Sequence, residues 1–171
     1  MTSQSIELPV ATSLGVFIAH YSQQGLAELD FPRNGPGRRV DQVVQKNNSG
    51  KVPVEVLRWH RMTSVALKKV LTGRTAETLP PLDWTGKTDF QKSVWRAMLK
   101  IPAGKTKSYG EIAEAVGKPK AVRAVGGACG ANPIPVLVPC HRVLAAHGKI
   151  GGFGSGLHWK RTLLEGEGVR I

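Results

Sequence analysis

The chain has 171 residues, enough for one or two small domains that bury a hydrophobic core. Its two cysteines are Cys129 and Cys140, and its apolar stretches are all shorter than the roughly 18 residues of a membrane span. No signal-peptide pattern opens the sequence. We therefore expect no membrane association and no structural disulfide, and we place the protein in the cytoplasm, or in the nucleus if its source is eukaryotic.

The formal net charge is +12, and most of the excess lies in the second half of the chain. Residues 87–171 hold 14 Lys and Arg against five Asp and Glu, a surplus of nine, whereas residues 1–86 have a surplus of three. A polyanion is the simplest partner for such a surface, because neutralising phosphates releases condensed counterions. The distribution favours nucleic acid, with a merely soluble cationic protein as the alternative.

The first half of the chain predicts a hairpin followed by a helix. Gly15–Tyr21 and Leu26–Phe31 have the composition of strands joined by a turn, and residues 33–50 predict a mobile loop whose role the sequence leaves open. Residues 54–71 then show helical periodicity, and Gly73 is the expected stop. The apolar side chains assigned to the buried face of this helix are Val54, Leu57, Met62, Val65, Leu67 and Val70.

The second half predicts several short helices in succession. After a proline-containing linker from Arg74 to Gly86, Thr88 and Gln91 form a capping-box pattern that opens a helix ending near Lys100. Its expected inward residues are Phe90, Val94, Ala97 and Met98. After a turn at residues 101–104, a second capping box of Ser108 and Glu111 opens another helix, which ends at Gly117 and buries Ile112, Ala113 and Val116.

A third helix is expected to start at Pro119, which suits a first helical turn, and to run to about Cys129. Two short helices joined by a tight turn in a basic context indicate a helix-turn-helix. The second helix is unusually poor in side-chain bulk, with Gly126 and Gly127 each lowering helix propensity by about 1 kcal/mol relative to alanine. Such a slender helix fits the minor groove of DNA, and close packing within the domain is the alternative.

The run Pro139-Cys140-His141-Arg142-Val143 places a thiol directly beside an imidazole. Neighbouring side chains of a regular strand point to opposite faces, so Cys140 and His141 share one site only if the backbone leaves the extended form. The prolines before Cys140 favour such a departure. A neighbouring base or cation favours the nucleophilic thiolate, whereas the simpler interpretation is a buried cysteine beside an exposed histidine.

Residues 88–168 as a whole resemble the O6-alkylguanine-DNA alkyltransferases, which repair alkylated guanine by a single-turnover reaction. The resemblance is carried by five blocks in family order: Ser108-Tyr109-Gly110, Arg123 to Ala128, Asn132 to Pro135, Pro139 to Val143, and Lys160-x-x-Leu163-Leu164-x-x-Glu167-Gly168. It implies transfer of an alkyl group from guanine O6 in double-stranded DNA, and from thymine O4, to a protein cysteine. It implies no cofactor.

The resemblance also implies catalytic roles for five residues. Cys140 is the expected nucleophile, His141 its base through a bridging water, and Glu167 the carboxylate that orients the imidazole. Glu165 is also within sequence reach, so the choice of Glu167 rests on the family register. Asn132 is expected to hold the turn before Cys140, and Tyr109 to donate its hydroxyl to the extruded base.

A second group of residues is expected to meet DNA and to line the pocket. Arg123 would insert into the base stack, and the other expected DNA contacts are Ser108, Tyr109, Ala121, Ala124 and Gly126. The expected pocket residues are Tyr109, Val143, Phe153, Gly154 and Ser155, of which the last three belong to a glycine-rich covering loop at residues 150–156. Phe153 stands where many relatives carry tyrosine, and this leaves the range of accepted alkyl groups open. Cys129 is expected only to pack.

These observations predict an α+β protein with a small N-terminal sheet-plus-helix domain at residues 1–86 and a winged-helix-like helix-turn-helix domain at residues 87–171. The first half lacks the cysteines and histidines with which human-type relatives bind zinc, so we expect no structural metal. We expect a monomer and leave cooperative loading on DNA open. The rival interpretations are a non-catalytic DNA-damage sensor of the same fold and a cysteine hydrolase with multiple turnovers.

Overall fold

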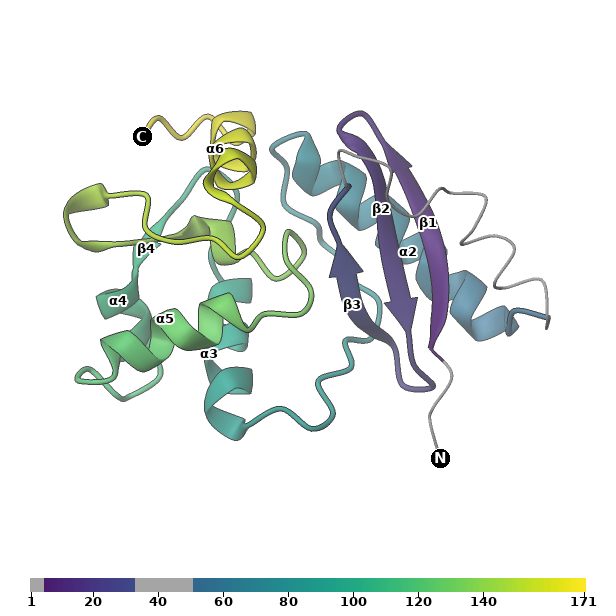
Figure 1. Cartoon of the computed structure of the whole chain (residues 1–171), viewed down its shortest axis with the longest axis horizontal. Coiled ribbons are helices and arrows are strands. Elements are labelled where there is room, and N and C mark those ends of the chain that lie inside the picture. Colours follow the sequence, from purple (N-terminus) through teal and green to yellow (C-terminus); the bar gives the residue numbers. More distant parts are fainter. Residues whose placement is uncertain (1–4, 33–50) are drawn as a thin grey trace. The chain divides into compact units, whose positions relative to one another are not determined.

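A computed structural model of the chain describes residues 5–32 and 51–171, and the loop expected at residues 33–50 lies outside them (Figure 1). The described residues divide into two compact units. The first consists of residues up to Lys68 together with Glu77–Asp83, and the second of Lys69–Ala76 together with Trp84–Ile171. The sequence predicted a domain boundary after residue 86, three residues beyond the observed boundary between residues 83 and 84. In addition, the second unit includes an earlier segment, Lys69–Ala76, that the sequence had assigned to the first domain.

In the described part of the first unit, an antiparallel sheet has the strand order β1-β2-β3, with β1 at Ile6–Thr12, β2 at Gly15–Tyr21 and β3 at Leu26–Asp30. The expected hairpin is therefore present, but β1 was missed. Its sequence contains Pro9, which argues against a central strand. The proline is accommodated because β1 is an edge strand, where Pro9 lies opposite Ile18 of β2.

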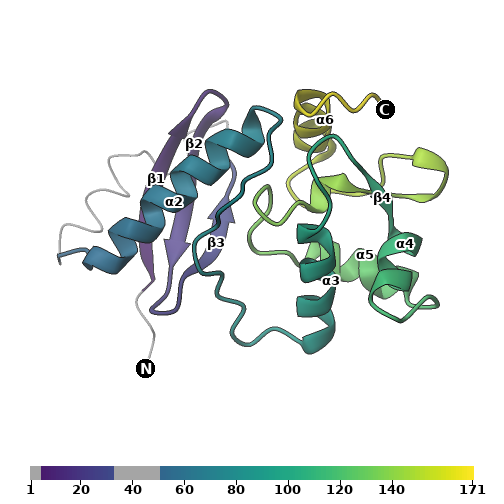
Figure 2. The same cartoon turned by 180° about the vertical axis from the view of Figure 1, so that it is seen from behind.

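Helix α2, at Val54–Leu71, crosses one face of this sheet (Figure 2). Its bounds agree with the sequence, but part of the expected buried face is wrong, because Val54, Leu57 and Val65 are 80%, 42% and 59% exposed. The buried positions are Val56, Trp59, Thr63, Ala66, Leu67 and Val70. Thr63 is buried although polar, since its hydroxyl donates to Trp59 O and accepts from the Tyr21 hydroxyl, each at 2.9 Å.

In the second unit, both predicted capping boxes are present and start the expected helices. Thr88 caps α3 at Asp89–Leu99, and Ser108 caps α4 at Tyr109–Ala115. The buried residues of α3 are Val94, Trp95 and Met98, so Trp95 takes the place expected for Phe90 and Ala97, which are half-buried. The Trp95 indole donates to Ala128 O of α5 at 2.8 Å and thereby ties α3 to α5.

Helix α5 spans Val122–Gly130 and packs against α4, as a helix-turn-helix requires. Its expected start is wrong: Pro119 lies in the turn before the helix, and Ala121 occupies the N-cap position without a side-chain hydrogen bond. The chain then continues through a 3-10 turn η1 at Cys140–Arg142, β5 at Val143–Leu144, a second 3-10 turn η2 at Ala146–Gly148, and α6 at Leu157–Gly166. Strand β5 pairs in parallel with β4 at Lys107–Ser108. The mixed architecture confirms the α+β class.

Candidate functional site

Cys140 begins η1, so the backbone leaves the extended form at the point where the sequence required it. The Cys140 amide donates to Val138 O at 2.8 Å, and Pro139 before it has φ −80° and ψ 67°. Both side chains of the Cys-His pair are buried: Cys140 is 7% exposed and His141 is fully covered. The simpler interpretation of an exposed histidine is therefore wrong.

Asn132 holds the turn that leads to Cys140. Its side-chain amide donates to Val138 O at 2.8 Å, and its Oδ1 accepts from the Ile134 amide at 3.0 Å. Within this turn Val136 has φ +73°, a conformation that a β-branched residue adopts only when its surroundings impose it. Asn132 thus fixes a strained backbone immediately before Cys140.

Glu167, the C-cap residue of α6, lies at the centre of a buried polar cluster. Its Oε1 is 2.9 Å from Nε2 of His141, and both carboxylate oxygens accept from Nε of Arg142 at 3.1 Å. Its side chain is 1% exposed, whereas Glu165 lies on the surface. The carboxylate selected by the family register is therefore the one in contact with the imidazole, and Arg142 is a partner that sequence reasoning missed.

The pairing with Glu167 defines the state of His141. A carboxylate only accepts, so Nε2 carries the proton and Nδ1 is the basic nitrogen. That Nδ1 is buried and has no hydrogen-bond partner among the described residues. Burial lowers the pKa of His141 and the hydrogen bond to Glu167 opposes this, so the imidazole is neutral at pH 7 and can accept a proton.

The pKa values of the Glu167 carboxyl and the Cys140 thiol are shifted in opposite directions. Burial alone would raise the pKa of Glu167, but hydrogen bonds from His141 and Arg142 hold it at about 2. Burial raises the pKa of the Cys140 thiol, with a hydrogen bond from Asn132 and the charge of Lys160 in partial opposition. Cys140 is therefore protonated at rest and needs a base to become a nucleophile.

Lys160 is a further charged group at the site to which the sequence assigned no role. It is fully buried in α6, and its Nζ donates to Val143 O at 2.7 Å and to Gly152 O at 3.2 Å. Burial lowers its pKa, while the nearby cysteines oppose this shift. Lys160 ties the glycine-rich segment after η2 to the strand that follows Cys140. Its position at the start of the fifth sequence block could have indicated a role for Lys160.

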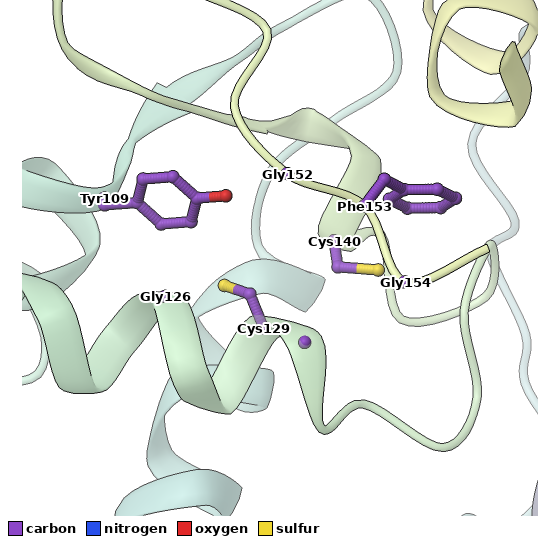
Figure 3. Close-up of a pocket in the computed structure, with 8 residues that line it drawn as sticks. Tyr109, Gly126, Cys129, Cys140, Gly152, Phe153 and Gly154 are labelled. Atoms are coloured by element: carbon purple, nitrogen blue, oxygen red, sulfur yellow. The ribbon is translucent and has the colours of Figure 1, made fainter. Parts of the chain in front are cut away.

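A cavity of about 150 Å³ opens beside the sulfur of Cys140 (Figure 3). Figure 3 shows side chains of α4 and α5 facing the segment that carries Gly152 and Phe153. The lining residues are Tyr109, Gly126, Cys129, Gly130, Cys140, Gly152, Phe153 and Gly154. Tyr109 is hydrogen-bonded to the Gly152 backbone, and burial raises the pKa of its hydroxyl, which therefore stays protonated.

Two expected pocket residues do not line this cavity. The side chain of Val143 is fully buried in the core and its carbonyl is taken by Lys160, while Ser155 is exposed outside the cavity. Conversely, Cys129 does more than pack, because it lines the cavity as well as contacting Met98 through sulfur atoms 3.6 Å apart. Burial raises the pKa of Cys129 to about 12, so this second thiol stays protonated.

The outer face of α5 carries few side chains. A Cβ atom added at Gly126, Gly127 or Gly130 would meet nothing within 4 Å, so these glycines are not needed for packing within the described structure. Arg123 and Ala124 are exposed on the first turns of this helix, and Ala121 and Gly126 are half-buried. Ser108 is also half-buried, with its hydroxyl accepting from the Glu111 amide as the cap of α4.

No group of three potential metal ligands is present among residues 5–32 and 51–171. Within the same described parts, no helix has both the length and the hydropathy needed to cross a membrane.

Comparison with known proteins supplies independent findings. Residues 89–169 match the family model of the 6-O-methylguanine DNA methyltransferase DNA-binding domain. The chain is 55% identical over 159 residues to a methylated-DNA--protein-cysteine methyltransferase of Methanosarcina barkeri, covering 91% of this chain and 92% of that protein. It is 53% identical over 104 residues to the Mycobacterium tuberculosis protein of the same name, covering 61% of this chain and 62% of that protein, or less than two thirds of its length.

Among solved structures, Mycobacterium tuberculosis OGT in complex with DNA is similar over both units. Its TM-score is 0.72 at 36% identity, with 95% of this chain and 92% of that chain covered. Similarity of this extent includes the sheet-plus-helix unit, which lies outside the five sequence blocks that carry the family resemblance.

Proposed function

The chain belongs to the family of methylated-DNA--protein-cysteine methyltransferases, and on this premise we propose that it transfers an alkyl group from guanine O6 in double-stranded DNA, and from thymine O4, to Cys140. The observation that carries the proposal is the hydrogen-bonded pair of His141 and Glu167 directly after Cys140 in the chain, with Cys140 lining a cavity. A DNA substrate places the protein where the cell holds its DNA, in the cytoplasm of a prokaryote or the nucleus of a eukaryote.

The proposed reaction begins with removal of the Cys140 proton. Nδ1 of His141 is the free basic nitrogen of the ring, and a water molecule bridging the two groups would carry the proton to it. The imidazolium that forms is stabilised by Glu167, which is ionised at neutral pH because its pKa is about 2. The role of Glu167 is thus to orient the ring and to offset its positive charge.

The thiolate then displaces guanine from the alkyl carbon in one step. The sulfur–carbon bond forms as the carbon–O6 bond breaks, and guanine leaves with the electron pair. The Tyr109 hydroxyl, protonated and at the cavity wall, is placed to donate a hydrogen bond to the departing base. Guanine takes up one proton as it leaves, and His141 releases the proton that it took from Cys140, so no net proton is gained or lost. The product is a thioether at Cys140, so each molecule reacts once.

Reaction at O6 requires the base to leave the helix, because the buried Cys140 sulfur has no access to a stacked nucleotide. The side-chain-poor outer face of α5 fits the minor groove, which is about 6 Å wide. Arg123 is exposed on this face and has no hydrogen-bond or ion-pair partner among the described residues, so it is available to fill the space left in the stack. Extrusion costs a few kcal/mol, less for a damaged pair.

The cavity must widen to accept the base. Its volume of about 150 Å³ equals that of engineered cavities that bind benzene, whereas an alkylated purine has two rings and a substituent. The wall formed by Gly152, Phe153 and Gly154 lies between two glycines with positive φ, Gly151 and Gly156. We therefore assign the opening movement to this segment.

The test is mass spectrometry of the protein after incubation with duplex DNA that contains O6-methylguanine. We expect one methyl group per chain, located on the Cys140 peptide. Cys129→Ser is the matched control, because it removes the other thiol of the cavity and should leave the methylation intact. An unmodified Cys140 peptide in the presence of excess substrate would reject the proposal in favour of the damage sensor, and repeated turnover would favour a cysteine hydrolase.

A further inference from the structure

The segment Lys69–Ala76 precedes the proline-containing linker, yet it belongs to the unit that contains Cys140. It begins with the last turn of α2, where the amides of Gly73 and Arg74 donate to Val70 O and Lys69 O, each at 3.0 Å. Gly73 has φ +76° and turns the chain out of the helix. The end of α2 and the residues that follow it therefore belong to the second unit, although a single boundary at residue 86 would assign them to the first.

Gly73 lies directly against the end of α6, one residue from the catalytic carboxylate. A Cβ atom at this position would overlap the carbonyl oxygen of Gly166 and would lie 3.4 Å from Cα of Glu167. The Gly166 atoms concerned are backbone atoms, which cannot rotate away as a flexible side chain does. The absence of a side chain at residue 73 therefore allows the main chain of Glu167 to occupy its present position.

The segment Lys69–Ala76 also contacts the surroundings of the Glu167 side chain, through the turn at residues 101–104. The Gly104 amide donates to its Oε2 at 3.1 Å, and Nη1 of Arg142 donates to Ile101 O at 2.6 Å, so the turn at residues 101–104 borders the carboxylate. Thr75 holds this turn, because its hydroxyl accepts from the Ala103 amide at 3.2 Å. Residues 73 and 75 thus contact both the backbone and the hydrogen-bonding surroundings of Glu167.

We propose that Gly73 and Thr75 are positioning residues for alkyl transfer, which hold Glu167 at hydrogen-bond distance from His141. This inference rests on the proposed function and extends the catalytic unit to a segment before the linker. Displacement of a catalytic group by about 1 Å can lower a rate by roughly a hundredfold. Loss of the contact at Gly73 should therefore slow chemistry while the proposed DNA-binding face of α5, which takes part in none of these contacts, keeps its affinity.

The first experiment compares Gly73→Ala with Gly86→Ala. Both glycines have almost the same positive φ, +76° and +75°, but a Cβ at Gly86 meets nothing within 4 Å. Both variants therefore place an alanine at a positive φ, and only Gly73→Ala adds the collision with α6. At saturating duplex DNA containing O6-methylguanine, we expect a methylation rate constant at least tenfold lower for Gly73→Ala, and wild-type DNA affinity for both variants.

The second experiment tests the route through Thr75. Thr75→Val removes the acceptor for the Ala103 amide. It should lower the rate constant about threefold, because the lost hydrogen bond affects the position of Glu167 only indirectly, through the turn at residues 101–104. Thr75→Ser keeps the hydroxyl and should restore the wild-type rate. This pair decides the question if Gly73→Ala does not fold, because Thr75 is exposed and its replacement leaves the core unchanged.

The pH profile separates positioning from general destabilisation. The charged groups that influence His141 are Glu167, Arg142 and Lys160, and of these only Glu167 raises its pKa. A displaced Glu167 should therefore move the acidic limb of the rate profile to lower pH in Gly73→Ala and not in Gly86→Ala. If Gly73→Ala or Thr75→Val methylates at the wild-type rate, the inference is wrong. If wild-type protein acquires no methyl group, the proposed function itself fails.

Discussion

Glu167 accepts a hydrogen bond from Nε2 of His141 at 2.9 Å although the two residues are 26 positions apart in the chain. The contact forms because the C-terminal end of α6 returns to η1, and it leaves Nδ1 of His141 as the only basic ring nitrogen. The tautomer of His141 is therefore determined by a residue at the end of another helix.

Glu167→Gln tests this dependence directly. The amide keeps the size of the side chain but removes the charge that stabilises the imidazolium, so we expect the methylation rate constant at pH 7.5 to fall about tenfold to a hundredfold. Because the carboxylate raises the pKa of His141, the acidic limb of the rate profile should also move to lower pH. Glu165→Gln, at an exposed carboxylate two residues away, should leave both quantities unchanged.

Acid stability provides a second measure of the same cluster. The pKa of Glu167 is lowered from 4.5 to about 2 in the folded state, so its ionisation stabilises the fold above pH 4.5 and this contribution is lost as the pH falls towards 2. The shift corresponds to up to about 3 kcal/mol of unfolding free energy.

Urea unfolding at several pH values should therefore show a steeper loss of stability between pH 4.5 and 2 for wild type than for Glu167→Gln. The variant should also be less stable at pH 7, because Arg142 loses its buried anionic partner. Equal slopes for the two proteins would mean that the carboxylate is not held at a low pKa. Glu165→Gln again serves as the reference and should follow the wild-type curve.

Cys140→Ser separates chemistry from DNA binding. The Cys140 side chain is 7% exposed beside the cavity, whereas the exposed residues of α5 form the expected DNA face. The variant should acquire no methyl group, because a serine hydroxyl is far less readily ionised than a thiol, and it should bind duplex DNA within about twofold of wild type. Fluorescence anisotropy with a labelled duplex gives the affinity, and loss of binding would show that the nucleophile and the binding surface are not separate.

Local patterns in the sequence were sufficient for most of the second unit. Both capping boxes started helices where Thr88 and Ser108 predicted them, because such caps depend only on residues three positions apart. The start of α5 was misplaced because Pro119 suits a turn as well as a first helical turn. The buried face of α2 was misassigned because Thr63 is covered through hydrogen bonds to a strand, which no helical periodicity encodes.

The candidate site was predictable where it depended on the family motif and not where it depended on tertiary contacts. The residues of the cluster around Cys140 were named from their sequence blocks, yet Arg142 and Lys160 received no role. Their partners, Glu167 and the carbonyls of Val143 and Gly152, become neighbours only through folding. Cys129 was assigned to packing because its place on the inner turn of α5 does not reveal the cavity beside it.

The glycines of α5 should distinguish internal packing from an external partner. Gly127 is exposed, and a Cβ there would meet no neighbour, so Gly127→Ala should raise the unfolding free energy by about 0.5–1 kcal/mol through helix propensity. Gly127→Leu should also fold but should weaken duplex binding at least tenfold, because its side chain would stand between the helix and the minor groove. Unchanged affinity of Gly127→Leu would place the DNA on another surface.

Gly130 should control how large an alkyl group the cavity accepts. It lines the cavity opposite Gly154, where an added Cβ would lie 3.8 Å from Gly130 O, and nothing lies within 4 Å of a Cβ at Gly130 itself. Because neither Gly130 nor Gly154 places a side chain in the cavity, wild type should react with free O6-benzylguanine. Gly130→Val should lower that rate at least tenfold, while the rate constant of methyl transfer at saturating duplex DNA, where affinity does not limit the reaction, changes less than threefold, because only the larger group needs the space.

Gly127→Val is the matched control, since Gly127 lies on the same helix, has equally open surroundings and does not line the cavity. It should react with the free base as wild type does, because that substrate does not require the DNA-binding face. Competition between benzylguanine and methylated duplex, read by mass spectrometry of the Cys140 peptide, measures the preference in one reaction. An equal loss of both activities in Gly130→Val would indicate damage to the site as a whole and would contradict a role for Gly130 in selecting the alkyl group.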